Sequence, residues 1–157
     1  MPARTWILRA PQEVTAIAQD AARDLPRAWQ VTQVLTELLL NAIEHGNLGF
    51  SSEDKHLLMQ RGLWQAALRR RLRQPPYSCR VVRLLRWREK RDWYFEVRDE
   101  GAGGDHAPSE RAGSAAACGR GLLLVEALLG APPQVSDGGR CVRFGVEMGG
   151  GAEGRVP

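Results

Sequence analysis

The pattern of apolar and polar positions predicts strands and helices in turn along this chain. Residues 5–9 form a short apolar stretch that predicts a strand. After Pro11, apolar residues recur at helical spacing as far as Leu25, and Pro26 separates this helix from a second one. Gly46 is expected to end the second helix. The buried stripe of this second helix is predicted to consist of Val31, Val34, Leu35, Leu38, Ala42 and Ile43.

The rest of the chain predicts a charged helical segment, a hairpin, a further helix and two closing strands. Along residues 93–99 of the hairpin, apolar and polar residues alternate as they do in a strand with one buried face. This order favours an α/β protein of the α+β kind, a two-layer sandwich in which helices cover one face of a mixed, mostly antiparallel sheet. The predicted later elements span residues 51–73 (broken near Gly62), 80–99, 121–129, 134–136 and 140–148.

A single domain is expected over residues 3–148, with a helical insert at about residues 51–76. Residues 102–118 are small, polar and rich in glycine and alanine, which is typical of a mobile loop. The tail at residues 149–157 is expected to be flexible.

A carboxylate and an amide, Glu37 and Asn41, lie one turn apart on the second helix, beside its apolar stripe. Polar groups at the edge of a core cost free energy unless they have partners, so this helix is expected to hold something polar. His45 follows four residues later, and we interpret it as a capping or packing residue.

A second carboxylate, Asp99, continues the apolar face of the strand before it. In that position it can accept a hydrogen bond from an exocyclic amine such as that of adenine. Gly101 and Gly103 follow, and they allow a tight turn and the close approach of a flat ring.

Two glycines, Gly119 and Gly121, stand at the start of the next helix, where free N–H groups and the helix dipole favour phosphate oxygens. Arg120 between them adds a charged donor. Each of these segments alone has a more ordinary explanation, as a surface stripe, a loop turn or a helix start. Together and in this order they favour a nucleotide site, in which Asn41 holds magnesium and Glu37 polarises an attacking hydroxyl or water.

The chain of 157 residues is mildly basic, with a formal charge of +4. Much of the excess lies at residues 69–73, which we interpret as a solvated helix face rather than a nucleic-acid site, because no aromatic platform accompanies it. An acidic protein partner stays open. Three cysteines without C-x-x-C spacing favour a reducing compartment, and the absence of a signal peptide or a long apolar helix favours a cytoplasmic protein without a membrane span.

The chain resembles the ATPase superfamily shared by DNA gyrase, MutL and sensor histidine kinases, which has the Bergerat fold. Within it, the chain is most similar to the small anti-sigma factor serine kinases. The resemblance implies that Glu37 is the general base, Asn41 the magnesium ligand and Asp99 the adenine-binding aspartate. It rests on residues 37–47, on the D-x-G-x-G box of Asp99, Gly101 and Gly103, and on the G-x-G-L motif of Gly119, Gly121 and Leu122.

The chain departs from the family pattern in two places. Gly104 stands where relatives often carry a bulky apolar residue, which implies a looser adenine pocket. The threonine that relatives carry before the final strand is not evident in residues 138–142. The helical insert resembles that of a subgroup in which the domain works beside receiver or phosphatase modules.

The resemblance implies an ATP- and magnesium-dependent serine kinase that phosphorylates an anti-sigma antagonist and so controls a sigma factor. The alternative is a nucleotide-responsive module that sequesters a regulator without phosphotransfer. Nucleic-acid binding through residues 69–73 is a third and more distant hypothesis. The sequence leaves open whether a sigma factor is bound directly and whether the chain forms a homodimer, as relatives often do.

Overall fold

The computed structural model describes residues 2–103 and 119–148. Residues 104–118 of the expected mobile loop, which include Gly104, lie outside the described residues. The expected tail at residues 149–157 also lies outside them. The strands are β1 (Arg4–Leu8), β2 (Val82–Glu89), β3 (Asp92–Arg98), β4 (Gln134–Ser136) and β5 (Cys141–Val146). The helices are α1 (Val14–Ala22), α2 (Ala28–Asn41), α3 (Ser52–Gln60), α4 (Trp64–Leu72) and α5 (Gly119–Leu129), with short turns η1 (Pro11–Glu13), η2 (Ala42–Asn47) and η3 (Tyr77–Cys79).

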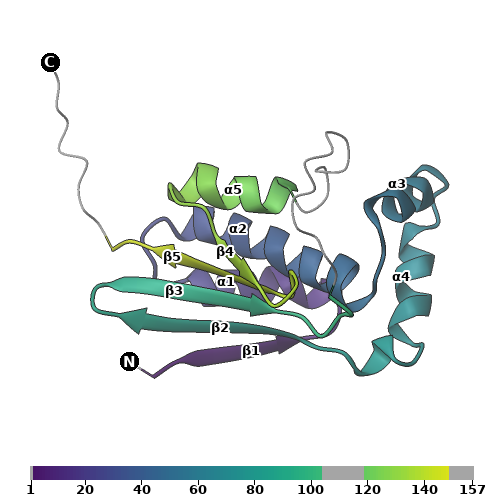
Figure 1. Cartoon of the computed structure of the whole chain (residues 1–157), viewed down its shortest axis with the longest axis horizontal. Coiled ribbons are helices and arrows are strands. Elements are labelled where there is room, and N and C mark those ends of the chain that lie inside the picture. The colour runs from purple at the N-terminus through teal and green to yellow at the C-terminus, as the bar shows by residue number, and fades with distance from the viewer. Residues whose placement is uncertain (1, 104–118, 149–157) are drawn as a thin grey trace, which may run out of the picture.

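The described strands form one sheet in the order β1-β2-β3-β5-β4. Helices α1, α2 and α5 cover one face of it, while α3 and α4 stand at one end of the molecule (Figure 1). The predicted two-layer α+β fold is therefore confirmed. The mixed character we expected is wrong for the described residues, because each strand pairing there is antiparallel.

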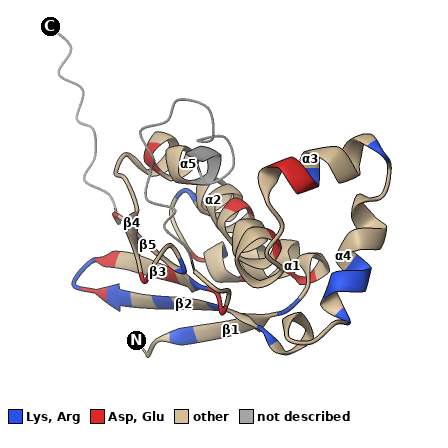
Figure 2. Cartoon of the chain, turned by 45° about the vertical axis from the view of Figure 1, so that its right-hand side comes forward, with Lys and Arg blue, Asp and Glu red and all other residues tan. Residues whose placement is uncertain are grey.

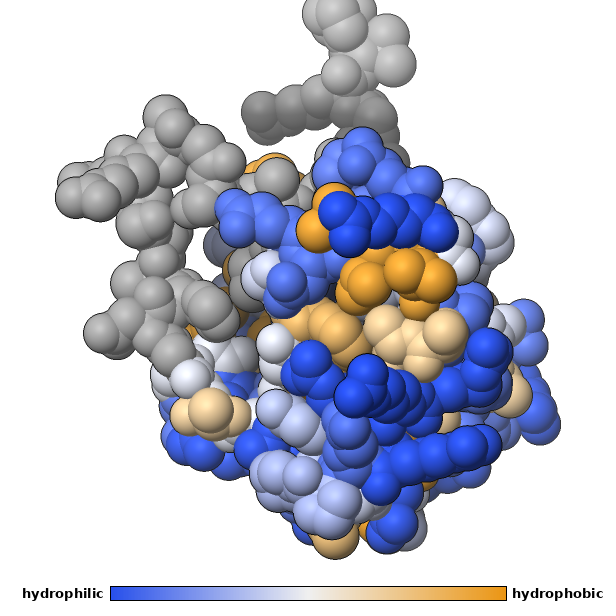
Figure 3. Space-filling model, turned by 90° about the vertical axis from the view of Figure 1, so that its right-hand side faces the viewer, coloured by the Kyte–Doolittle hydropathy of each residue, from blue (hydrophilic) through white to orange (hydrophobic). Residues whose placement is uncertain are grey.

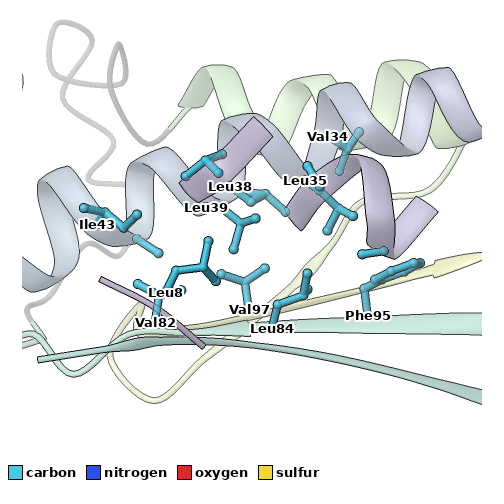
Figure 4. Close-up of a cluster of buried hydrophobic side chains, with 14 of the residues drawn as sticks. Leu8, Val34, Leu35, Leu38, Leu39, Ile43, Val82, Leu84, Phe95 and Val97 are labelled. Carbon is cyan, nitrogen blue, oxygen red and sulfur yellow. The ribbon is translucent and has the colours of Figure 1, made fainter. Parts of the chain in front are cut away.

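The core lies between α2 and the sheet, as the spacing of apolar residues predicts. All six residues of the predicted stripe of α2 and its extension are buried. Figure 4 shows α2 side chains pointing toward Leu8, Leu84 and Val97 of the sheet. Burial of a leucine or valine side chain stabilises the folded protein by about 1.5–3 kcal/mol. The packing of this layer therefore fixes where the C-terminal end of α2 lies.

The end of α2 differs from the prediction. The chain does not leave the helix at Gly46 but continues as the π-helical turn η2. The amide of Leu48 donates to the Ile43 carbonyl, five residues back, at 2.9 Å. His45 donates from Nδ1 to the Phe50 carbonyl at 2.5 Å, three residues after η2 ends.

The predicted helical insert is a hairpin of two helices. Ser51 caps α3 by accepting a hydrogen bond from the Asp54 amide at 3.0 Å, and its own amide donates to the Asp54 carboxylate at 2.9 Å. Gly62 has a φ of +67° and separates the helices, as its position in the sequence predicts. Of the helices in the described part of the chain, none is both long and apolar enough to cross a membrane.

Candidate nucleotide site

The segments singled out in the sequence meet at one end of the two-layer fold. β3 ends there, α2 passes into η2 there, and α5 begins there, next to α2 (Figure 1). At the opposite end, the Arg27 guanidinium donates to the Leu128 carbonyl and so joins the start of α2 to the end of α5. The elements that carry the three segments thus end or begin on the same side of the fold.

The Asp99 carboxylate lies directly against Gly46. A methyl group built on Gly46 would stand 2.5 Å from Asp99 Cγ and 2.6 Å from Oδ2. Gly101 is equally close to the same turn, because a methyl group there would overlap the Gly46 carbonyl oxygen. Glycine is therefore required at both positions for β3 to reach the end of α2.

The two oxygens of Asp99 have different surroundings. Oδ1 accepts a hydrogen bond from the Gly101 amide at 2.8 Å. Among the described residues, no protein donor reaches Oδ2 within hydrogen-bond distance. A half-buried carboxylate with one free oxygen is suited to accept a hydrogen bond from a ligand amine.

Burial raises the pKa of the Asp99 carboxyl above its ordinary value of 3.8. The Gly101 amide and the charges of Arg140 and Arg80 act in the opposite direction and favour the ionised form. The Asp99 backbone is also fixed, since its amide donates to the Arg140 carbonyl at 3.0 Å. The carboxylate is thus held in a defined place and is poorly solvated.

Asn47 connects the end of η2 to the turn after β3. Its Oδ1 accepts a hydrogen bond from the Glu100 amide at 2.7 Å, and its backbone carbonyl accepts one from Arg80 at 2.8 Å. Asn47 is 2% exposed, and within the described residues its Nδ2 has no partner. The Glu100 carboxylate in turn accepts from the Val81 amide at 2.9 Å. These bonds hold the Asp99 turn from both sides.

Glu37 and Asn41 lie half-buried on α2, one turn apart as predicted. Neither side chain forms a hydrogen bond or ion pair with another described residue, so both are available to a ligand. Gly103, after the Asp99 turn, has a φ of +65° and lies against the Arg140 side chain.

The phosphate-binding candidates are in the first turn of α5, which begins at Gly119, two residues before the predicted start. Gly119, Arg120 and Gly121 are part of this turn, where helix N–H groups lack helical partners. Leu122 is partly buried against the core and anchors the turn.

The hairpin of α3 and α4 is fastened to the same end of the fold. Lys55 of α3 forms an ion pair of 2.5 Å with Glu44 of η2, whose side chain is only 5% exposed. Arg71 of α4 donates to the Leu48 carbonyl at 2.7 Å and lies over the rings of Phe50 and Tyr77. The insert is therefore joined to the turn that carries Gly46 and Asn47.

We predict that Lys55→Met destabilises the protein by about 3 kcal/mol, because it leaves the Glu44 carboxylate buried without its cation. Urea unfolding at neutral pH measures this. The double variant Glu44→Gln/Lys55→Met should recover most of the loss, since it removes both charges. A single variant as stable as the wild type would contradict the importance of this ion pair.

Several residues of the site were not assigned from the sequence. The sequence predicts for Gly46 only the end of a helix, and it predicts no role for Asn47. Arg80 and Arg140 act through backbone carbonyls and long-range charge, which residue spacing does not reveal. The signal in the sequence is that Gly46 and Asn47 close the helix motif of residues 37–47, since a glycine permits a close approach of two segments.

The chain matches the histidine kinase-like ATPase domain family over residues 4–146. It belongs to this family. Among curated proteins, none matches the chain. Membership supports ATP binding and a kinase-like ATPase activity, and proteins with this domain generally bind ATP with magnesium. The residues present fit such a ligand, because the free Oδ2 of Asp99 can accept from the adenine amine, and Glu37 and Asn41 on α2 are not engaged by other described side chains.

Proposed function

We propose that this chain is a serine kinase of the anti-sigma type that uses ATP and magnesium to phosphorylate a protein antagonist in a partner-switching system. The observation that carries the proposal is the packing of the Asp99 turn against Gly46, at the end of the helix that bears Glu37 and Asn41. This contact supports a common site for the nucleotide base and the phosphate-transfer residues. Such a system would act in the cytoplasm.

Each residue of the site has a proposed role. Asp99 accepts the hydrogen bond of the adenine amine, and the free N–H groups at the start of α5 hold phosphate oxygens. Asn41 supplies a neutral oxygen ligand to magnesium. Glu37 orients the serine hydroxyl of the antagonist and accepts its proton. When bound, ATP with magnesium supplies the phosphoryl group, and catalysis rests mainly on positioning and charge neutralisation.

We predict that Glu37→Gln binds ATP with wild-type affinity but transfers phosphate to a candidate antagonist at least about 100-fold more slowly, because the amide cannot accept the proton. Incubation with ATP labelled in its terminal phosphate, followed by counting of label on the antagonist, measures the rate. Glu126→Gln, an exposed change on α5, is the matched control and should leave the rate unchanged.

Two outcomes would change the proposal. Wild-type transfer by Glu37→Gln would remove this residue as the base. If the wild-type chain binds both ATP and the antagonist but moves no label, the nucleotide-responsive sequestering module is the correct function.

A further inference from the structure

The positive charge of the chain is concentrated in the α3–α4 hairpin. Residues 51–76 contain six basic and two acidic residues, a net charge of +4, which equals the formal charge of the whole chain. The remainder of the chain is therefore neutral. Figure 2 shows basic residues in the second half of α4 and in the turn before it, with acidic residues near the start of α3.

Only part of this charge is used inside the protein. Lys55 and Arg71 make the contacts with η2 and Leu48 described above. The other four arginines are exposed, and none of them forms an ion pair with a described residue. On α4, Trp64 and Leu68 face inward, so the exposed arginines of this helix lie on its outer side. The four exposed residues are Arg61, Arg69, Arg70 and Arg73.

The same hairpin exposes large apolar side chains. Leu57 is 46% exposed, Met59 58% and Leu63 49%. Figure 3 shows apolar surface on this face of the molecule, with hydrophilic side chains on both sides of it. Exposed apolar side chains beside arginines are typical of protein interfaces, in which arginine is enriched. A nucleic-acid site is less favoured, because Phe50 and Trp64 beside the hairpin are buried and Tyr77 is partly buried under Arg71.

The hairpin is also held firmly enough to orient a bound protein. Phe50 and Trp64 pack edge to face with ring centroids 5.0 Å apart, and Lys55 lies over the Trp64 ring. The contacts of Lys55 and Arg71 join both helices to the turn beside the candidate nucleotide site. A protein bound to the hairpin is thus placed next to the end of α2.

We propose that the α3–α4 hairpin is the docking surface for an acidic, amphipathic segment of a protein partner. Carboxylates of that segment pair with the exposed arginines, and its apolar side covers Leu57 and Leu63. This inference deepens the proposed function, on which it rests for the identity of the partner. The protein that receives the phosphoryl group is bound by the insert, outside the nucleotide pocket.

The test uses fluorescence anisotropy with the whole chain and a fluorescent helical peptide that has leucines along one face and glutamates along both edges of that face. The triple variant Arg69→Glu/Arg70→Glu/Arg73→Glu should weaken binding at least about tenfold, and high salt should reduce the difference. The variant Leu57→Ser/Leu63→Ser should also weaken binding. A matched triple variant, Arg88→Glu/Lys90→Glu/Arg91→Glu, reverses three exposed charges at the end of β2 and in the turn after it, at the other end of the molecule, and should bind as the wild type does.

Equal loss in the two triple variants would show general charge attraction and overturn the docking surface, as would absence of peptide binding. Duplex DNA and anionic lipid vesicles are tested in the same way. If either binds more tightly than the peptide and loses this binding in the Arg69→Glu/Arg70→Glu/Arg73→Glu variant, the surface binds that ligand instead. ATP affinity, measured by calorimetry on the same proteins, should be unchanged in all of them. Absence of ATP binding by the wild type would overturn the proposed function but not the docking surface.

Discussion

Asp99→Asn is expected to reduce ATP affinity about 100-fold, which corresponds to about 3 kcal/mol. In the wild type, one oxygen accepts from the Gly101 amide at 2.8 Å and the other is free for the ligand amine. An asparagine side chain has only one oxygen. Its NH₂ group, which is a donor, would therefore face either the Gly101 amide or the ligand amine, and both of these are donors as well. Calorimetry with ATP and with ADP, each with and without magnesium, measures the loss.

The same substitution should not reduce the melting temperature of the ligand-free protein, because it removes a poorly solvated charge. Asp92→Asn, at the other end of β3, is the control and should leave ATP affinity unchanged. If Asp99→Asn retains wild-type affinity, adenine does not bind at this carboxylate.

The raised pKa of Asp99 gives this first prediction a pH dependence. Because the folded protein binds a proton on this carboxyl more readily than the unfolded chain does, this group makes stability decrease as pH rises from 3.8 through the raised pKa. ATP affinity should change in the opposite direction. It should fall on acidification through the raised pKa of Asp99, since the protonated carboxyl loses its charge-assisted hydrogen bond. In Asp99→Asn this pH dependence should be absent.

Gly101→Ala is expected to destabilise the protein by about 3 kcal/mol and to abolish measurable ATP binding. The added methyl group would overlap the Gly46 carbonyl oxygen. Neither group can turn away by a side-chain rotation, because each is attached directly to the backbone. The Asp99 turn must therefore move away from η2. Urea unfolding and calorimetry with ATP measure the two effects.

A matched control for Gly101→Ala is Gly62→Ala in the turn between α3 and α4. Gly62 has open space around it but a φ of +67°, so alanine there should cost only about 1 kcal/mol and leave ATP affinity intact. Wild-type ATP affinity in Gly101→Ala would mean that the close contact between the two turns is not needed for binding.

The sequence predicts most of the fold because its elements are amphipathic and well separated. Alternation along β3 places Trp93, Phe95 and Val97 in the core and brings Asp99 to the end of that face, as expected. The spacing on α2 likewise identifies its buried stripe. Local patterns of this kind depend only on periods of two and 3.6 residues.

The details of the site depend on contacts between distant segments, which no local period encodes. Asn47 meets Glu100 only because α2 ends where β3 ends. Arg140 reaches the Asp99 amide through strand pairing. The π-helical turn was not predicted because its residues, from Ala42 to Asn47, fit an α-helix equally well by composition.

The wide turn η2 also restricts how the chain can change in length. Deleting one residue before Gly46 without a change in winding would shift each later residue of the turn by one position, about 100° around the helix axis. The bare Cα surface of Gly46 would face away from β3, and a bulkier neighbour would take its place against the Asp99 carboxylate. Insertions and deletions should therefore be tolerated better in the α3–α4 hairpin than in η2.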